Sequence, residues 1–181
     1  MSHFGAGTEY ALHCLLFLTD GETAHSPGSR DLADFQGISP SYVAKLFTSL
    51  ERAGIVSSTQ GAKGGFRLSR PASDISVLDV VDAVEGRKSI FQCRNIRVNC
   101  ALFGEKAPAW AGSGLCAIHQ VMIDAEEKMR EELARVTLSD LNDSVSAKAP
   151  AGFTPKVIDW FADRQADRFR ARSPRKSSQE Q

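Results

Sequence analysis

Apolar residues recur at helical spacing along most of the chain, and this pattern predicts its helices. The predicted helices cover residues 8–19, 30–36, 40–53, 76–84, 116–136 and 154–172. Two of them carry start signals. Ser29 can cap the second helix, while Ser39 and Pro40 give the third a capping hydroxyl and a proline at its first position. The chain should therefore be mainly helical.

The pattern changes just after the third predicted helix. Two short β-prone runs, IVSSTQ and FRLSR, flank the glycine-rich stretch GAKGG, and this arrangement predicts a β-hairpin. Two helices joined by a turn at Gly37 and followed by a hairpin have the order of a winged helix-turn-helix. The expected fold class is mainly α with a small β-hairpin wing, and a long amphipathic helix follows later in the chain.

A polar face remains on helix 40–53 once its apolar stripe is buried. Three side chains near the N-terminal end of this face are placed to reach base edges: Ser41, Tyr42 and Lys45. Three more polar residues surround the predicted wing tip: Gln60, Lys63 and Arg67. The glycines there let the backbone approach phosphates, and Lys63 can neutralise one. The alternative is a small all-helical domain with solvated surface charges.

The chain divides into four segments by these patterns. They are a winged helix-turn-helix domain (1–86), a cysteine-bearing loop (87–115), a long helix region (116–142) and a C-terminal extension (143–181). Residues 150–152 form a linker within the extension, and the end RARSPRKSSQEQ is expected to be a disordered basic tail. Helix 154–172 should dock on the domain or on a second copy through its apolar stripe. The stripe consists of Val157, Ile158, Phe161 and Phe169.

Charge and composition exclude several classes of protein. The formal net charge is zero, yet residues 30–70 hold six Lys or Arg against three Asp or Glu. The zero net charge of the whole chain therefore conceals a basic first half. No run approaches the roughly 18 apolar residues of a membrane span, and no secretory signal is visible. The chain is therefore expected to be cytoplasmic, without a membrane partner. It has no P-loop, no GxSxG and no nucleophile–base spacing, which argues against an enzyme.

Titratable and sulfur-bearing side chains form two groups in the sequence. Glu9 and His13 lie one turn apart on an otherwise apolar helix, whereas Cys14 is rotated away from that face and should be a buried thiol. The second group follows the winged domain and comprises Cys93, Cys100, Cys116 and His119. Thiols in a cytosolic protein suit iron–sulfur clusters or zinc. The irregular spacing of these cysteines leaves zinc, a cluster and free thiols all open.

Several stretches together resemble one family. TEYAL, ISPSYVAKLFTSLERAGIVSSTQGAKGGFRLSRPASDISVLDVVDAVEG, CAIH and VTLSDL occur in the order typical of the Rrf2 family, the IscR/NsrR-type winged-helix regulators. The resemblance covers roughly residues 1–142. It implies a bacterial homodimer that binds a partly palindromic DNA operator, with 116–136 as a long dimerisation helix. Family members often carry arginine where this wing has Gln60.

The same resemblance implies a cofactor. The phrase EYALHC is most similar to the redox-responsive RsrR type, in which a glutamate and a histidine of this helix bind a two-iron (2Fe-2S) cluster. Carried over, Glu9 and His13 of one subunit and Cys93 and Cys116 of its partner would be the ligands. Cys100 and His119 are the alternates in a three-cysteine pattern. A 4Fe-4S cluster, zinc or no cofactor are the other possibilities.

The resemblance thus predicts a homodimeric transcriptional regulator whose cluster senses redox state, or a related signal, and sets operator affinity. Tyr10 adjoins Glu9 and is the candidate relay of that signal. The alternative function is a zinc-stabilised or cofactor-free dimer that acts as a thiol sensor or structural adaptor.

Overall fold

The structure, a computed structural model, describes residues 3–19, 26–59, 61 and 64–172 of the 181-residue chain. A winged-helix body comes first, and its elements are α1 (Ala6–Leu16), α2 (Ser29–Gln36), α3 (Pro40–Arg52), β1 (Val56–Thr59), β2 (Gly65–Leu68) and α4 (Val77–Glu85). The predicted order of helices and hairpin is confirmed, and so is the mainly helical fold class.

The start of α2 differs from the prediction. Gly28, and not Ser29, is the N-cap residue, and the Asp31 carboxylate accepts a hydrogen bond from the Gly28 N–H at 2.9 Å. The start of α3 is as predicted in position but not in chemistry. Ser39 is the N-cap and Pro40 follows it, yet the Ser39 hydroxyl shares a hydrogen bond of 2.9 Å with Ser41 and does not cap the helix.

The core of the body lies where α1 to α4 and the hairpin meet. Its fully buried members include Leu15, Leu32, Val43, Phe47, Leu50 and Val80. The two strands pair antiparallel, with Val56 opposite Leu68. Phe66 of β2 packs on Phe47, with ring centroids 4.4 Å apart, so the wing hairpin is fixed to helix α3.

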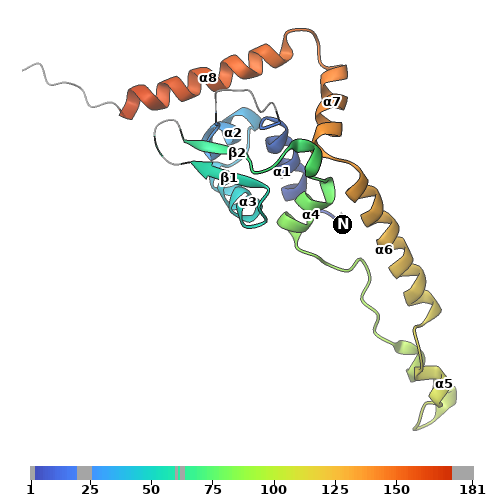
Figure 1. Cartoon of the computed structure of the whole chain (residues 1–181). Helices are drawn as coiled ribbons and strands as arrows, with labels where there is room; N and C mark the ends of the chain where they lie inside the picture. The colour runs from blue at the N-terminus through green and yellow to red at the C-terminus, as the bar shows by residue number, and fades with distance from the viewer. Residues whose placement is uncertain (1–2, 20–25, 60, 62–63, 173–181) are drawn as a thin grey trace, which may run out of the picture.

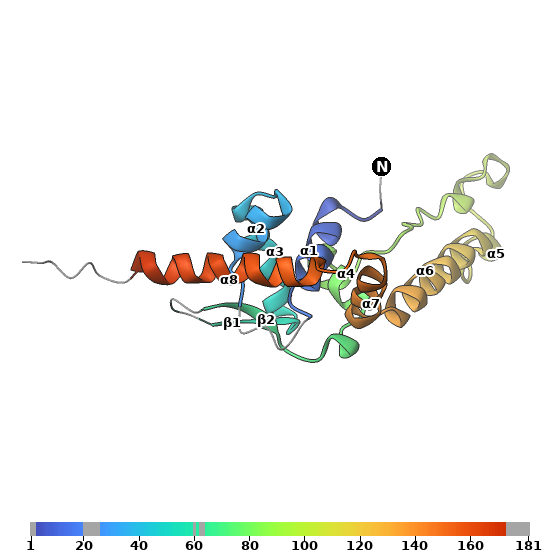
Figure 2. The ribbon, with the colours of Figure 1, turned by 90° about the horizontal axis from the view of Figure 1, so that it is seen from above.

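An arm of residues 87–135 extends away from the body (Figure 1). It contains two short 3-10 turns, the short helix α5 (Ala109–Gly112) and the long helix α6 (Ala117–Arg135). The segment before α5 and helix α6 leave the body in the same direction in both views (Figures 1 and 2). Arg130 of α6 pairs with Asp82 of α4 through hydrogen bonds of 2.9 and 2.6 Å, which fastens the arm at its base.

The chain then returns to the body through α7 (Leu138–Lys148) and α8 (Phe153–Arg172). Helix α7 was not predicted as a separate helix, although Thr137 and Asp140 form a capping box at its start. Residues 150–152 connect the two helices, as predicted. Helix α8 runs along the body beside α2 and the hairpin (Figure 2). Among the helices of the described residues, none is both long and apolar enough to cross a bilayer.

Docking of α8 on the domain is confirmed. Phe161 is 6% exposed and belongs to the core cluster, where its ring lies 5.1 Å from Phe35 and 5.7 Å from Phe17. Phe169, the last residue of the predicted stripe, is 51% exposed. The predicted disordered tail, residues 173–181, lies outside the described residues.

Ion pairs complete the α8 contact. Arg164 pairs with Asp34, and Arg168 pairs with Asp31 at 3.2 Å. Asp31 is only 3% exposed, so these arginines supply the positive charge that a buried carboxylate requires. Arg168 also donates to the backbone carbonyls of Ser26 and Gly64. Helix α8 therefore joins α2 to the turn end of the wing hairpin.

Candidate nucleic-acid interface and ligand groups

The outer face of α3 carries the predicted DNA-contacting residues. Val43, Leu46, Phe47 and Leu50 are buried, and this turns the other side of the helix outward. Ser41, Tyr42 and Lys45 are all exposed there. The structure thus brings the three side chains together at the N-terminal half of the recognition helix, where base edges are usually read.

Tyr42 differs from its neighbours because its ring also contacts α1. It is 37% exposed, and it meets Tyr10 edge to face with ring centroids 5.9 Å apart. A Cβ atom at Gly7 would lie only 3.0 Å from the Tyr42 hydroxyl, so glycine there permits the close approach. This contact links α1 directly to the recognition helix, and sequence reasoning missed it.

The wing presents one described basic side chain. Arg67 is exposed on β2, and its Nε donates to the Ser57 hydroxyl at 3.3 Å across the strand pair. The Phe66 N–H donates to the Pro27 carbonyl at 2.9 Å, which anchors β2 to the segment before α2. Gln60 and Lys63, the other predicted wing residues, lie outside the described residues.

Glu9 and His13 share one exposed face of α1. Both side chains line a depression between α1 and α7, together with Leu12, Leu141 and Val145. The predicted juxtaposition on one stripe is present. The stripe faces away from the core of the body, because Ala11, Cys14 and Leu15 take the buried side of the helix.

The cysteines follow the predicted division into one buried thiol and three accessible ones. Cys14 is fully buried, and this burial raises the pKa of its thiol to about 12. A thiolate is the form that binds metal, so Cys14 is unsuited to be a ligand. Cys93 and Cys116 are half-buried in the arm, and Cys100 is exposed.

Cys116 occupies the N-cap position of α6. Its thiol makes no capping hydrogen bond of ordinary geometry, but the nearby backbone amides of His119 and Ile118 lower its pKa, and the positive charge of Arg97 adds to the effect. A helix N-terminus favours the thiolate in general. The surroundings of Cys116 thus favour ionisation of its thiol.

Arg97 holds the two sides of the cysteine loop together. Its Nη2 donates to the Gly114 carbonyl at 2.6 Å, and its Nε donates to Asn95 at 2.9 Å. The Asn95 N–H in turn donates to the Cys93 sulfur at 3.4 Å. Arg97 therefore connects the surroundings of Cys93 with the chain just before Cys116.

The alternate ligands have surroundings of their own. His119 is half-buried, and its ring lies 5.8 Å from that of Phe91. Cys100 precedes a 3-10 turn. Within the described part of the chain, no three His, Cys, Asp or Glu side chains converge as a metal site. A single copy therefore does not unite the α1 pair with the cysteines of the arm.

A carboxylate that sequence reasoning missed holds the start of α1. Glu85, at the end of α4, accepts hydrogen bonds from the Gly5 N–H at 2.8 Å and the Thr8 hydroxyl at 3.1 Å. These hydrogen bonds, the Gly5 N–H foremost, lower the pKa of Glu85. A terminal glutamate after VVDAV gives no signal of this role, because the contact depends on how α4 packs on α1.

Comparison with known proteins places the chain in a family. A family model named Rrf2 and described as an iron-dependent transcriptional regulator matches residues 4–144. YwgB of Bacillus subtilis, named an HTH-type transcriptional regulator, is 32% identical over 155 residues, which are 86% of this chain and 92% of YwgB.

Two solved structures share the fold. CymR, the global cysteine regulator of B. subtilis, aligns with a TM-score of 0.61 and 22% identity over 80% of this chain and 98% of that one. IscR of T. potens gives a TM-score of 0.61 and 22% identity over 84% and 96% of the two chains. The likeness confirms the winged-helix architecture.

Proposed function

Since the chain belongs to the Rrf2 family of DNA-binding transcriptional regulators and is not an enzyme, we propose that it is a homodimer whose iron–sulfur cluster sets its affinity for a partly palindromic operator. It would act on the chromosome in the cytoplasm. The observation that carries the proposal is the exposed pair Glu9 and His13, which faces a depression and contributes nothing to the core.

DNA would be bound by the outer face of α3 and by the wing. Ser41, Tyr42 and Lys45 reach base edges in the major groove, and Arg67 contacts the backbone beside it. Gln60 and Lys63 complete the wing contact. The exposure of the first four side chains supports this assignment. Lys45 and Lys63 supply positive charge that neutralises phosphates.

Dimerisation would use α6. This helix of 19 residues has no buried residue in a single copy. Ile118 and Val121 are 65% and 63% exposed on its surface, and adjacent exposed apolar side chains are typical of an interface. Pairing two α6 helices would bury them and would bring each arm close to the body of the second copy.

The donor set fits a two-iron cluster shared between copies. Glu9 and His13 offer an oxygen and a nitrogen side by side, and Cys93 and Cys116 of the second copy offer two thiolates. A bound cluster of this kind supplies a one-electron change of charge. The chain's own residues hold the ligands in position: Arg97 braces the cysteine loop, and Glu85 fixes the start of α1.

Tyr10 would carry the signal to the DNA-binding surface. It follows Glu9 in α1, and its ring rests on Tyr42 of α3. A small movement of α1 at Glu9 therefore shifts the Tyr10 ring and with it the N-terminal end of the recognition helix. The bistable element is the packing of α1 against α3.

The ligand set is tested on full-length protein purified without air. It should show visible absorption, iron and acid-labile sulfide. Cys93→Ala and Cys116→Ala should abolish the absorption, and His13→Ala should abolish it or shift it. Cys14→Ala is the matched control, because its buried thiol takes no part.

Two outcomes would replace this ligand set. If His13→Ala keeps the wild-type spectrum while Cys100→Ala with His119→Ala removes it, the three-cysteine pattern is correct. Colourless protein that contains zinc or no metal would favour the thiol-sensor alternative instead.

The relay and the DNA face are tested with a selected operator. Tyr10→Leu should leave the spectrum unchanged but reduce the difference in operator affinity between oxidised and reduced protein.

Lys45→Ala should relax sequence preference and lower the dependence of log affinity on log salt concentration by about one. Lys128→Ala on α6 should change neither property. Wild-type behaviour of Lys45→Ala would show that α3 presents a different face to DNA.

A further inference from the structure

A cavity of about 320 Å³ lies between α1, α2, α7 and α8. It is separate from the wing and from the outer face of α3. The family match ends at residue 144, so one wall, helix α8, comes from a segment beyond that match. The cavity therefore depends on a part of this chain that the match to the family does not include.

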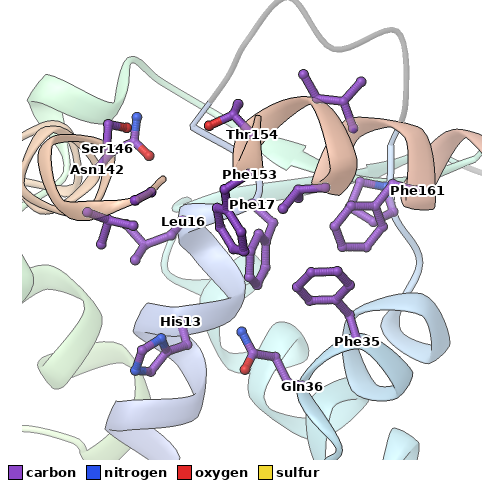
Figure 3. Close-up of a pocket in the computed structure, with 15 residues that line it drawn as sticks. His13, Leu16, Phe17, Phe35, Gln36, Asn142, Ser146, Phe153, Thr154 and Phe161 are labelled. Carbon is purple, nitrogen blue, oxygen red and sulfur yellow. The ribbon is translucent and has the colours of Figure 1, made fainter. Parts of the chain in front are cut away.

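Aromatic side chains dominate one side of the cavity. Phe17, Phe35 and Phe161 contribute phenyl rings whose centroids lie 4.8 to 5.7 Å apart, and Phe153 adds a fourth at the start of α8. Figure 3 shows Phe35 and Phe161 together on one side and the polar Asn142 and Ser146 of α7 on the other. Rings in such positions offer faces and edges to another aromatic molecule.

The polar side chains of the described lining are His13, Gln36, Asn142, Ser146 and Thr154. The same lining holds no Lys, Arg, Asp or Glu. Amide and hydroxyl groups can donate to and accept from a neutral oxygen. A carboxylate or sulfonate would lose its hydration here without gaining a fixed counter-charge.

We propose that this cavity binds a small neutral aromatic molecule, of one or two rings, that bears a hydroxyl or carbonyl group. The volume is at the lower end of the range for small-molecule sites, and the described lining is mostly apolar, with a few polar side chains and no Lys, Arg, Asp or Glu. The rings occupy the phenylalanine side, and the oxygen reaches the amides and hydroxyls of the opposite side.

Such a ligand would bear on DNA binding through the walls themselves. Phe35 and Gln36 belong to α2, the first helix of the helix-turn-helix, and Phe161 belongs to α8. Arg168 of α8 also bonds Asp31 and the Gly64 carbonyl at the turn end of the wing hairpin. A molecule that bridges α2 and α8 stabilises the arrangement of all three elements. This effect acts through α2 and α8, although His13, a proposed cluster ligand, also lines the cavity.

The probe is 2-naphthol, measured by calorimetric titration of the full-length protein. One molecule should bind per chain, and naphthalene-2-sulfonate, with the same rings and a negative charge, should bind at least about tenfold more weakly. Ala149→Phe fills the cavity from the C-cap of α7 and should weaken the binding of 2-naphthol about tenfold or more. Ala147→Phe, in the last turn of α7 but outside the lining, should bind 2-naphthol within about twofold of wild type.

A second filled variant guards against misfolding. If Ala149→Phe lowers the unfolding temperature, Ile158→Trp fills the cavity from α8 and carries the test. The proposal is overturned if wild-type protein fails to bind 2-naphthol, if both filled variants bind it normally, or if the sulfonate binds equally well. The proposal is also overturned if the protein does not bind 2-naphthol and Ala149→Phe by itself dissociates the dimer. That result would mean that a second copy of the chain covers this face.

Discussion

The body and the arm of this protein are built on opposite principles. In the body, residues from every helix are completely buried, among them Leu15, Leu32, Phe47 and Val80. In the arm, residues 87–135, all of which the structure describes, only Ala111 is buried. Large apolar side chains of the arm stay exposed instead, such as Trp110 at 71% and Leu102 at 91%. The body contains its own core, whereas the arm leaves most of its large apolar side chains exposed in a single copy.

The largest effect should come from the core of the body. Phe47→Ala removes a fully buried ring that packs on Phe66 and should lower the free energy of unfolding by about 3–5 kcal/mol. Trp110→Ala in the arm should lower it by less than about 0.5 kcal/mol. Urea denaturation of both variants measures the contrast. Equal losses would mean that the arm shares the core of the body.

An intermediate effect should come from charges placed on the arm. Ile118→Glu combined with Val121→Glu should raise the dissociation constant of the proposed dimer about a hundredfold, equivalent to about 3 kcal/mol. The helical content should not change, because neither residue contacts the body core. Sedimentation velocity over a range of concentrations measures the constant, and Gln120→Glu controls for added charge. A double variant that dimerises normally would exclude α6 as the interface.

The smallest effect should come from the junction of the two regions. The Arg130 guanidinium lowers the pKa of Asp82 below its ordinary value of 3.8. The pair therefore contributes its full stabilisation above that value and loses it as the pH falls through the lower pKa of the folded state. Asp82→Asn should reduce stability at pH 7 and flatten the decline in acid. Denaturant titrations from pH 7 down to about pH 3 test this, and an unchanged acid profile would assign no role to the pair.

The same division explains what the sequence could predict. The body was predictable because helix 40–53 and its neighbours bury regular apolar stripes, and the hairpin has a glycine-rich turn between β-prone runs. Helix α7 was missed because Leu138 is its only buried residue. The cap of α2 was misassigned because Ser29 has the preferred chemistry, yet the Asp31 carboxylate reaches the Gly28 amide from within the helix.

The candidate site was predictable only where it is local. The spacing of Glu9 and His13 places them on one face of any helix, and the structure has them on one face. The contact of Tyr10 with Tyr42 depends on the angle at which α1 crosses α3, which spacing alone does not encode. The arginines of α8 were missed for the same reason, since their acidic partners lie far away in the sequence.

Helix α8 also determines when folding of the body can be completed during synthesis. Arg168 bonds the Ser26 carbonyl across a separation of 142 residues, and Phe161 contacts Phe17 and Phe35, which come much earlier in the sequence. The earlier helices can fold during synthesis, but these contacts must wait until α8 has been made. A nascent chain would therefore carry Phe17 and Phe35 without Phe161 while the intervening segment is being synthesised.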